Sequence, residues 1–171
     1  FRDDRMIDWM PPPHTLGLLW SLNQLTRTPF TLPCPDEPDR SLSLELDRAR
    51  ASCHARLVQG RPAIDVRAEV EATLQMQECH ANLATPEAIV RLNSILQEAL
   101  SARIAESIRY TQERRSDVFG FGQMLGRNAP TYWAGVRDVW DDELYPTLKP
   151  AVTVRARVRN VGLVSYPLPV R

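Results

Sequence analysis

The sequence lacks both a charge excess and a long apolar run, and each absence excludes a class of protein. Its 21 Lys and Arg residues balance 21 Asp and Glu residues. Binding to nucleic acid through bulk electrostatics needs a large basic excess, so we expect no nucleic-acid partner. No stretch approaches the roughly 18 consecutive apolar residues of a membrane span. An apolar content of 43% is too high for a disordered chain, which predicts a folded protein.

Cysteine is scarce, and its three copies, Cys34, Cys53 and Cys79, are scattered along the chain. Their odd number leaves at least one of them unpaired within the chain, and they do not assign a redox compartment. Cys53-His54 and Cys79-His80 contain the ligand types of a zinc site. In the continuous hairpin predicted below the two pairs would lie more than about 30 Å apart, so we expect no shared site. We interpret Cys53 as a small core residue and His54 as a surface residue.

The sequence begins at Phe1 without a starting Met, and its first residues do not form a signal peptide. We therefore expect a piece cut from a longer protein. At this length a chain buries about 70% of the surface that it exposes when unfolded, so one ordinary core is enough. We expect residues 1–171 to form a single domain.

Hydrophobic periodicity predicts both helices and strands. Pro11–Pro13 interrupt a short apolar stretch, since proline continues neither a helix nor a strand ladder. Apolar residues three and four apart after Thr15 and after Thr85 indicate amphipathic helices. The predicted elements are a strand at 5–10, a helix from Thr15 to about Arg27, an extended piece at 31–32, a rigid polar loop at 33–39, a hairpin at 42–77, a long helix at 85–114, a helix turn at 116–126, a short aromatic helix at 132–140 and a strand at 152–158.

The hairpin at 42–77 is predicted to have one buried and one solvated face. In its second strand, the even-numbered residues from Ile64 to Met76 are apolar and the odd-numbered ones are polar. In its first strand, the apolar positions change from even numbers at Leu42–Leu46 to odd numbers at Ala49–Leu57. This change predicts a β-bulge or a bend near Asp47-Arg48.

Turn residues predict the remaining irregular places. Gln59-Gly60-Arg61-Pro62 predicts the turn of the hairpin, and a change of parity at Asn160-Val161-Gly162 predicts a bulge at the end of the last strand. Gly120, Gly122 and Gly126 predict a helix turn that packs close to another backbone.

None of the motifs with chemical potential predicts catalysis or a cofactor site. The glycines at 120–126 lack the lysine of a phosphate-binding loop, because the only lysine is Lys149. The acidic residues Asp138, Asp141, Asp142 and Glu143 lack the spacing of a calcium loop and are interpreted as a solvated helix end. The histidines His14, His54 and His80 lie on separate segments, and no nucleophile motif is present, so we expect no enzyme, metal or cofactor.

Three arginines alternate with apolar residues on the last predicted strand. They are Arg155, Arg157 and Arg159, and they share one side of that strand. Such a row is either an electrostatic contact for a partner or an edge protected against aggregation. These three residues are the candidate site for partner contact.

A series of motifs resembles the C-terminal region of the Ger(x)C family, the C subunits of bacterial spore germinant receptors. The motifs are Gly17-Leu18-Leu19-Trp20, Thr31-Leu32-Pro33-Cys34-Pro35, Val70-Glu71, Asp117-Val118-Phe119-Gly120-Phe121-Gly122, Tyr132-Trp133, Trp140, Tyr145-Pro146, the strand Val152–Val158 and Asn160-Val161-Gly162-Leu163. They cover nearly the whole chain. The basic character usual in that family is only partly kept, in Arg127 and Arg155–Arg159.

The resemblance implies a lipoprotein that an acylated N-terminal cysteine, outside this chain, tethers to the outer face of the spore inner membrane. It would act beside integral-membrane A and B subunits, and this chain would be its last domain. The resemblance implies no catalysis and transfers no active-site residues. In its light Phe119, Phe121, Trp133 and Trp140 are interpreted as core.

Together these observations predict an α+β fold. We expect a curved, mostly antiparallel sheet with a long helix packed on one face and smaller helices at its end. The expected function is non-enzymatic, namely assembly and signalling of the germinant receptor through protein–protein contacts. The alternative is a small-molecule binding domain that holds a germinant or a lipid headgroup in a cleft between helix and sheet.

Overall fold

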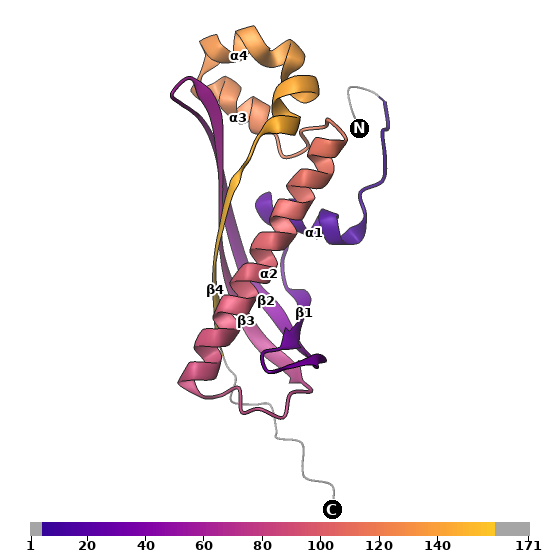
Figure 1. The fold of residues 1–171 in the computed structure, drawn as a ribbon, viewed down its shortest axis with the longest axis vertical. Helices are drawn as coiled ribbons and strands as arrows, with labels where there is room; N and C mark the ends of the chain where they lie inside the picture. Colours follow the sequence, from indigo (N-terminus) through magenta and orange to yellow (C-terminus); the bar gives the residue numbers. More distant parts are fainter. Residues whose placement is uncertain (1–4, 160–171) are drawn as a thin grey trace, which may run out of the picture. The chain divides into compact units, whose positions relative to one another are not determined.

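The computed structural model describes residues 5–159, which contain four strands and four α-helices. In chain order these are α1 (Pro12–Ser21), β1 (Thr28–Cys34), β2 (Glu37–Val58), β3 (Arg61–Gln77), α2 (Pro86–Glu113), α3 (Phe121–Asn128), α4 (Pro130–Val136), the short helical turns η1 (Arg137–Val139), η2 (Trp140–Leu144) and η3 (Tyr145–Thr147), and β4 (Ala151–Arg159) (Figure 1). The strands form one sheet in the order β1-β2-β3-β4. The predicted α+β class with a mostly antiparallel sheet is confirmed.

The chain divides into two compact units, and the long elements β2, β3, α2 and β4 contribute to both. The tip unit consists of Phe1–Gln24, Ala51–Ala68 and Ser101–Thr153, and contains α1, the turn of the β2–β3 hairpin, α3 and α4. The sheet unit consists of Leu25–Arg50, Glu69–Leu100 and Val154–Arg171. The single domain expected for residues 1–171 stays a prediction.

β1 is an antiparallel edge strand of the sheet unit. It pairs with β2 from Thr28 opposite Leu46 to Cys34 opposite Glu37. The predicted polar loop at 33–39 is wrong, because only Pro35 and Asp36 form the turn between the two strands. Proline is tolerated in an edge strand, because one side of that strand has no partner that needs a backbone N–H.

The β2–β3 hairpin turns at Gln59-Gly60, where φ is 51° and 75°. Positive φ at both residues suits a two-residue turn between antiparallel strands. Even-numbered residues of β3 from Ile64 to Leu74 are buried as predicted, whereas Met76 is 60% exposed and lies outside the core. The buried positions of β2 change from even numbers at Leu42–Leu46 to odd numbers by Ala55, which confirms the predicted change of phase.

α2 begins and buries its apolar stripe as the sequence predicts. The Thr85 hydroxyl accepts a hydrogen bond from the Ala88 N–H at 3.2 Å, which caps the first turn. Along one stripe the helix buries Leu92, Leu96, Leu100, Ile104 and Ile108. No described helix is long and apolar enough to cross a membrane.

The N-terminal segment differs from its prediction. Residues 6–10 form no strand, and Arg5 makes only an isolated bridge. α1 starts at Pro12 and ends at Ser21, earlier at both ends than the predicted helix. The proline run starts this helix because the first N–H groups of a helix need no partner within it, so proline is tolerated there.

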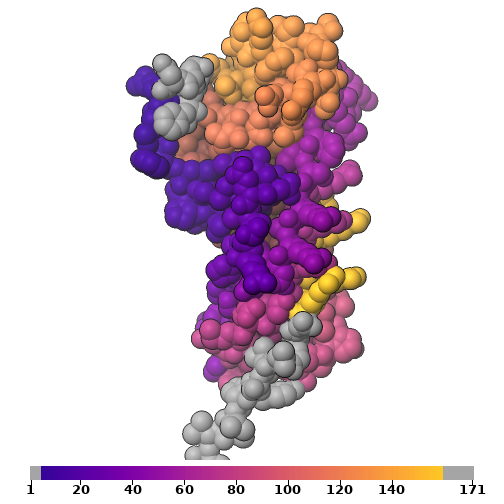
Figure 2. Space-filling model, turned by 180° about the vertical axis from the view of Figure 1, so that it is seen from behind, coloured from indigo at the N-terminus to yellow at the C-terminus, as the bar shows by residue number. Residues whose placement is uncertain are grey.

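An aromatic core holds the helices of the tip unit together, and Figure 2 shows α3 and α4 massed beside the end of the hairpin. Phe119, Phe121 and Trp140 are buried as predicted, and Tyr145 is buried with them, whereas Trp133 is half-buried. The predicted aromatic helix over 132–140 is shorter, because η1 and η2 replace its end. The four predicted core aromatics therefore gather in one unit, and only Trp133 lies at its margin.

The glycines of α3 pack against indole rings, not against another backbone as predicted. A Cβ atom added at Gly122 would lie 2.6 Å from both the Trp133 and the Trp140 rings, and one at Gly126 would lie 2.9 Å from Trp133. The Asp117 carboxylate accepts hydrogen bonds from the Gly122 N–H at 2.6 Å and from the Trp140 Nε1 at 3.0 Å. Asp117 thus fixes the start of α3 against the same tryptophan.

Cys34 and Cys79 form a buried disulfide in the sheet unit, with their Cα atoms 5.8 Å apart. Sequence reasoning left this pairing open. The bond removes Cys79 from the zinc ligands considered above. His54 is exposed, as predicted. Cys53 is a free thiol whose pKa is raised by burial, but it is only half-buried and so does not belong to the core as predicted. The predicted bulge at 160–162 lies outside the described residues.

Candidate interaction surface

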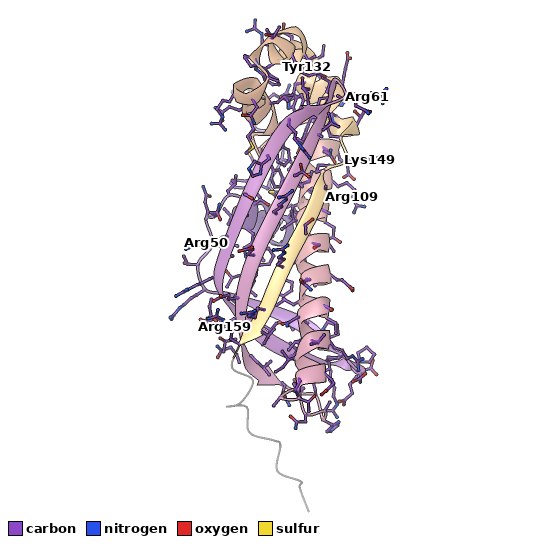
Figure 3. The ribbon with its side chains drawn as sticks, turned by 90° about the vertical axis from the view of Figure 1, so that its left-hand side faces the viewer. Arg50, Arg61, Arg109, Tyr132, Lys149 and Arg159 are labelled. Carbon is purple, nitrogen blue, oxygen red and sulfur yellow. A yellow bond between two sulfur atoms is a disulfide. The ribbon has the colours of Figure 1, made fainter. Side chains whose placement is uncertain are left out.

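The three candidate arginines lie on the solvent-facing side of β4. Arg155, Arg157 and Arg159 are exposed, and they alternate with Val154 and Val158, which are buried against the core. Figure 3 shows Arg159 at the end of β4 and Arg50 on β2. The predicted alternation of this strand is therefore confirmed, and it directs the arginines outward.

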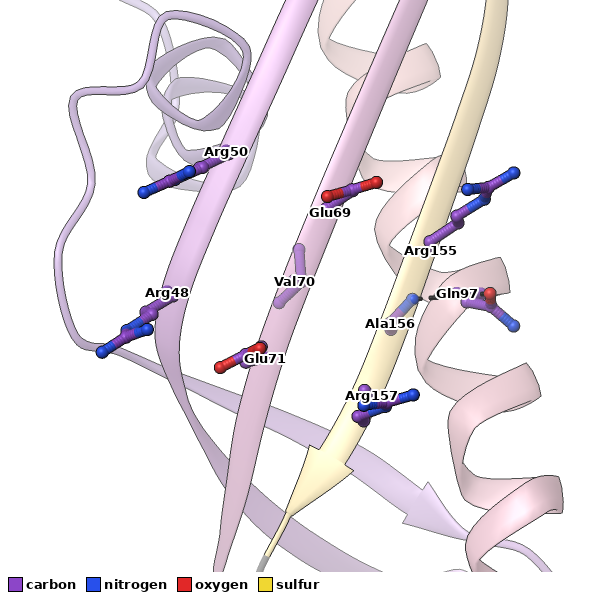
Figure 4. Close-up of a pocket in the computed structure, with 9 residues that line it drawn as sticks. All are labelled: Arg48, Arg50, Glu69, Val70, Glu71, Gln97, Arg155, Ala156 and Arg157. Atoms are coloured by element: carbon purple, nitrogen blue, oxygen red, sulfur yellow. Dashed lines mark hydrogen bonds between the residues drawn. The ribbon is translucent and has the colours of Figure 1, made fainter.

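The structure adds charged residues from two more strands to this row. An open groove of about 640 Å³ is lined by residues of β2, β3 and β4 (Figure 4). Its charged side chains are Arg48 and Arg50 from β2, Glu69 and Glu71 from β3, and Arg155 and Arg157 from β4. With Arg159, these seven residues are called the arginine face below.

The arginine face has a positive balance, with five arginines against two glutamates. Arg159 pairs with Glu71. In the part of the chain that the structure describes, Arg48, Arg50, Arg155 and Arg157 make no ion pair. Four guanidinium groups, each with five N–H donors in a planar fork, are therefore available to carboxylates of a partner.

Strand direction explains how these residues come together. In Figure 4, β3 and β4 run in the same direction, as two strands joined by a crossover helix do, whereas β2 runs in the opposite direction. Arginines from both neighbours therefore flank the glutamates of β3. Sequence reasoning missed Arg48 and Arg50, although the change of phase at Asp47-Arg48 already places both on the outer side of β2.

Parts of both sheet edges are occupied or blocked, which leaves the outer face of the sheet as the more accessible surface. The β4 N–H groups of Ala156 and Val158 donate to the side-chain oxygens of Gln97 at 3.4 Å and Asn93 at 2.8 Å on α2. On the other edge, β1 contains Pro29 and Pro33, which have no N–H to offer. At these positions a partner strand would find donors that are already engaged or missing.

The acids Glu37 and Glu78 form a second charged site, at the start of β2, with local partners. Glu37 accepts hydrogen bonds from His80, and Glu78 accepts them from the N–H and hydroxyl of Ser41. These bonds lower the pKa of both carboxyl groups. All their partners belong to the sheet unit, so this site stabilises the unit and offers little to a ligand.

Comparisons with known proteins agree with this fold. Residues 1–162 match the family model described as Spore germination B3/GerAC like, C-terminal, and the chain belongs to this family. The chain is 24% identical over 160 residues to Spore germination protein KC of Bacillus subtilis (strain 168), which covers 94% of the chain and 39% of that protein.

A solved structure shows the same fold. The crystal structure of the GerBC protein superposes with a TM-score of 0.79 at 14% identity, over 92% of this chain and 48% of that chain. The chain thus spans less than half the length of each of these relatives. The comparisons therefore identify this chain as the C-terminal domain of that family, and not as a whole receptor subunit.

Proposed function

We propose that this chain is a non-enzymatic domain of a spore germinant receptor subunit, and that it promotes receptor assembly and nutrient-triggered germination through protein–protein contacts. Membership of the spore germination family supports the biological setting. The arginine face is the observation that carries the contact, because four of its arginines make no ion pair with any residue that the structure describes.

The expected partners are the integral-membrane A and B subunits of the receptor. An acidic surface on either subunit would complement the arginine face, since opposite potentials steer and orient association. The expected location is the outer face of the spore inner membrane, reached through an N-terminal lipid anchor outside this chain. The Cys34–Cys79 disulfide supports such a location, because disulfides persist in oxidising compartments.

Charge reversal in the full-length subunit tests this contact. Arg155→Glu combined with Arg157→Glu should reduce the amount of A and B subunits that co-purify from spore membranes by at least tenfold, because tenfold corresponds to about 1.4 kcal/mol and like charges placed against each other across an interface cost several kcal/mol. Germination in response to nutrients should slow in parallel. The matched control is Arg109→Glu combined with Arg137→Glu, which changes net charge equally at exposed positions away from the arginine face.

Folding of both variants is checked by thermal melting of the isolated chain, and only variants with unchanged melting temperatures are compared. The co-purification should also weaken as salt is raised, since salt screens exposed charges. Normal assembly and germination in the β4 variant would rule out the arginine face as the contact.

A further inference from the structure

The tip unit contains a cleft that is separate from the arginine face and has no role in the contact proposed above. Its volume is about 590 Å³, and its walls come from the β2–β3 hairpin, from α4 and from the segment that leads into β4. Figure 3 labels one residue from each wall, namely Arg61, Tyr132 and Lys149.

The cleft has an excess of positive charge. Its lining contains Arg56, Arg61 and Lys149 but a single acid, Asp65. Asp65 is held by Arg56, with their charged atoms 3.1 Å apart. Arg61 and Lys149 are exposed and make no ion pair with any residue that the structure describes. Two cations from different walls therefore remain for an anion.

The rest of the lining is largely apolar. It consists of Pro62, Ala63, Ile64, Leu144, Leu148 and Ala151, with Thr147 and Tyr132 as polar additions. The Tyr132 hydroxyl makes no hydrogen bond within the described part of the chain, so it is available as a donor. A ligand that fits this lining has an anionic head and an apolar body.

We propose that this cleft, defined by Arg61, Tyr132 and Lys149, binds the phosphate group of an amphiphile. A guanidinium fork, an ammonium and a hydroxyl from three walls match the several oxygens of a phosphate, which accept more hydrogen bonds than a carboxylate. The apolar lining contacts the carbon atoms attached to the phosphate. The same chemistry is offered by an anionic phospholipid headgroup in a bilayer and by a free phosphate ester.

The single lysine of the chain makes the test specific. Lys149 carries the only ε-amine of the sequence, so peptide mass spectrometry can follow its acylation by an amine-reactive ester separately from that of the N-terminus. The probes are phosphatidylglycerol vesicles, glycerol 3-phosphate and inorganic phosphate, each compared with sodium chloride at equal ionic strength. A ligand at about ten times its Kd should slow the acylation about tenfold.

The variants separate a built site from general attraction to charge. Arg61→Ala should abolish the protection of Lys149, whereas Arg109→Ala, an exposed arginine on α2, should leave it unchanged. Protection by vesicles alone assigns the site to a headgroup, and protection by glycerol 3-phosphate assigns it to a phosphate ester; both support the proposal. The proposal is overturned if no phosphate probe slows the acylation of Lys149. It is also overturned if Lys149 is protected to the same extent in the Arg61→Ala variant as in the parent chain.

Discussion

At the scale of single residues, Gly122 is a position with no room for a side chain. Because a Cβ atom there would meet two indole rings at 2.6 Å, we expect Gly122→Ala to lower the free energy of unfolding by about 1–3 kcal/mol, the usual cost of overpacking. Gly135→Ala is the control, since no atom lies within 4 Å of its added Cβ. Urea unfolding followed by tryptophan fluorescence measures both variants, and equal stability of the two would contradict the packing argument.

The glycines also show what single residues can and cannot predict. Their spacing correctly indicated close packing around α3, because small side chains are needed wherever another group approaches. The nature of that group did not follow, since Trp133 and Trp140 come from later elements and no local pattern fixes the direction of their rings. The same limit applies to Cys34 and Cys79, whose pairing depends on which strands become neighbours.

At the scale of elements, the disulfide joins β1 to the segment that follows β3, across 45 residues of sequence. We expect Cys34→Ser combined with Cys79→Ser to lower the free energy of unfolding by about 4 kcal/mol, because a crosslink of this span restricts the unfolded chain. Cys53→Ser is the control, and it should change the value by less than about 1 kcal/mol. Dithiothreitol should reproduce the loss in the parent chain and leave the double variant unchanged; a parent chain equally stable with and without it would refute this role.

Elements with a strong period were predicted well, whereas the extents of α1 and β1, which both contain prolines, were not. The buried stripe of α2 and the alternation of β3 follow from residues within one element, so the sequence alone predicts them. The sequence predicts a loop at Pro33 and a break at Pro12, yet one lies in an edge strand and the other starts a helix. Proline excludes only the middle of an element, and its place at an edge or an end depends on neighbours that sequence does not show.

The arginine face was likewise predicted only in part. Arg155–Arg159 could be predicted to share a side, because they belong to one strand, whereas their grouping with Arg48 and Arg50 required the strand order.

At the scale of the whole molecule, the net charge is zero, and within each unit several carboxylates accept hydrogen bonds from residues of the same unit. In the tip unit, Arg114 and Tyr110 donate to Asp8 and lower its pKa. In the sheet unit, His80 lowers the pKa of Glu37, and Ser41 lowers that of Glu78. These carboxylates are therefore held within their own units, and stability should depend on keeping them ionised.

The sign of the pH dependence follows from these lowered pKa values. Carboxyl groups in the unfolded chain titrate near 3.9 for Asp and 4.3 for Glu, so the stabilisation is complete above about pH 5 and is lost as pH falls through the lower, folded values. We expect the free energy of unfolding to decrease steadily from about pH 5 to pH 3, and Glu37→Gln combined with Glu78→Gln to flatten this decrease while lowering stability at pH 7. Glu98→Gln, at an exposed site of α2 without a described partner, should keep the slope of the parent chain. Urea titrations at each pH measure the slopes, and a Glu37/Glu78 variant as acid-sensitive as the parent would mean that the decrease arises from other groups.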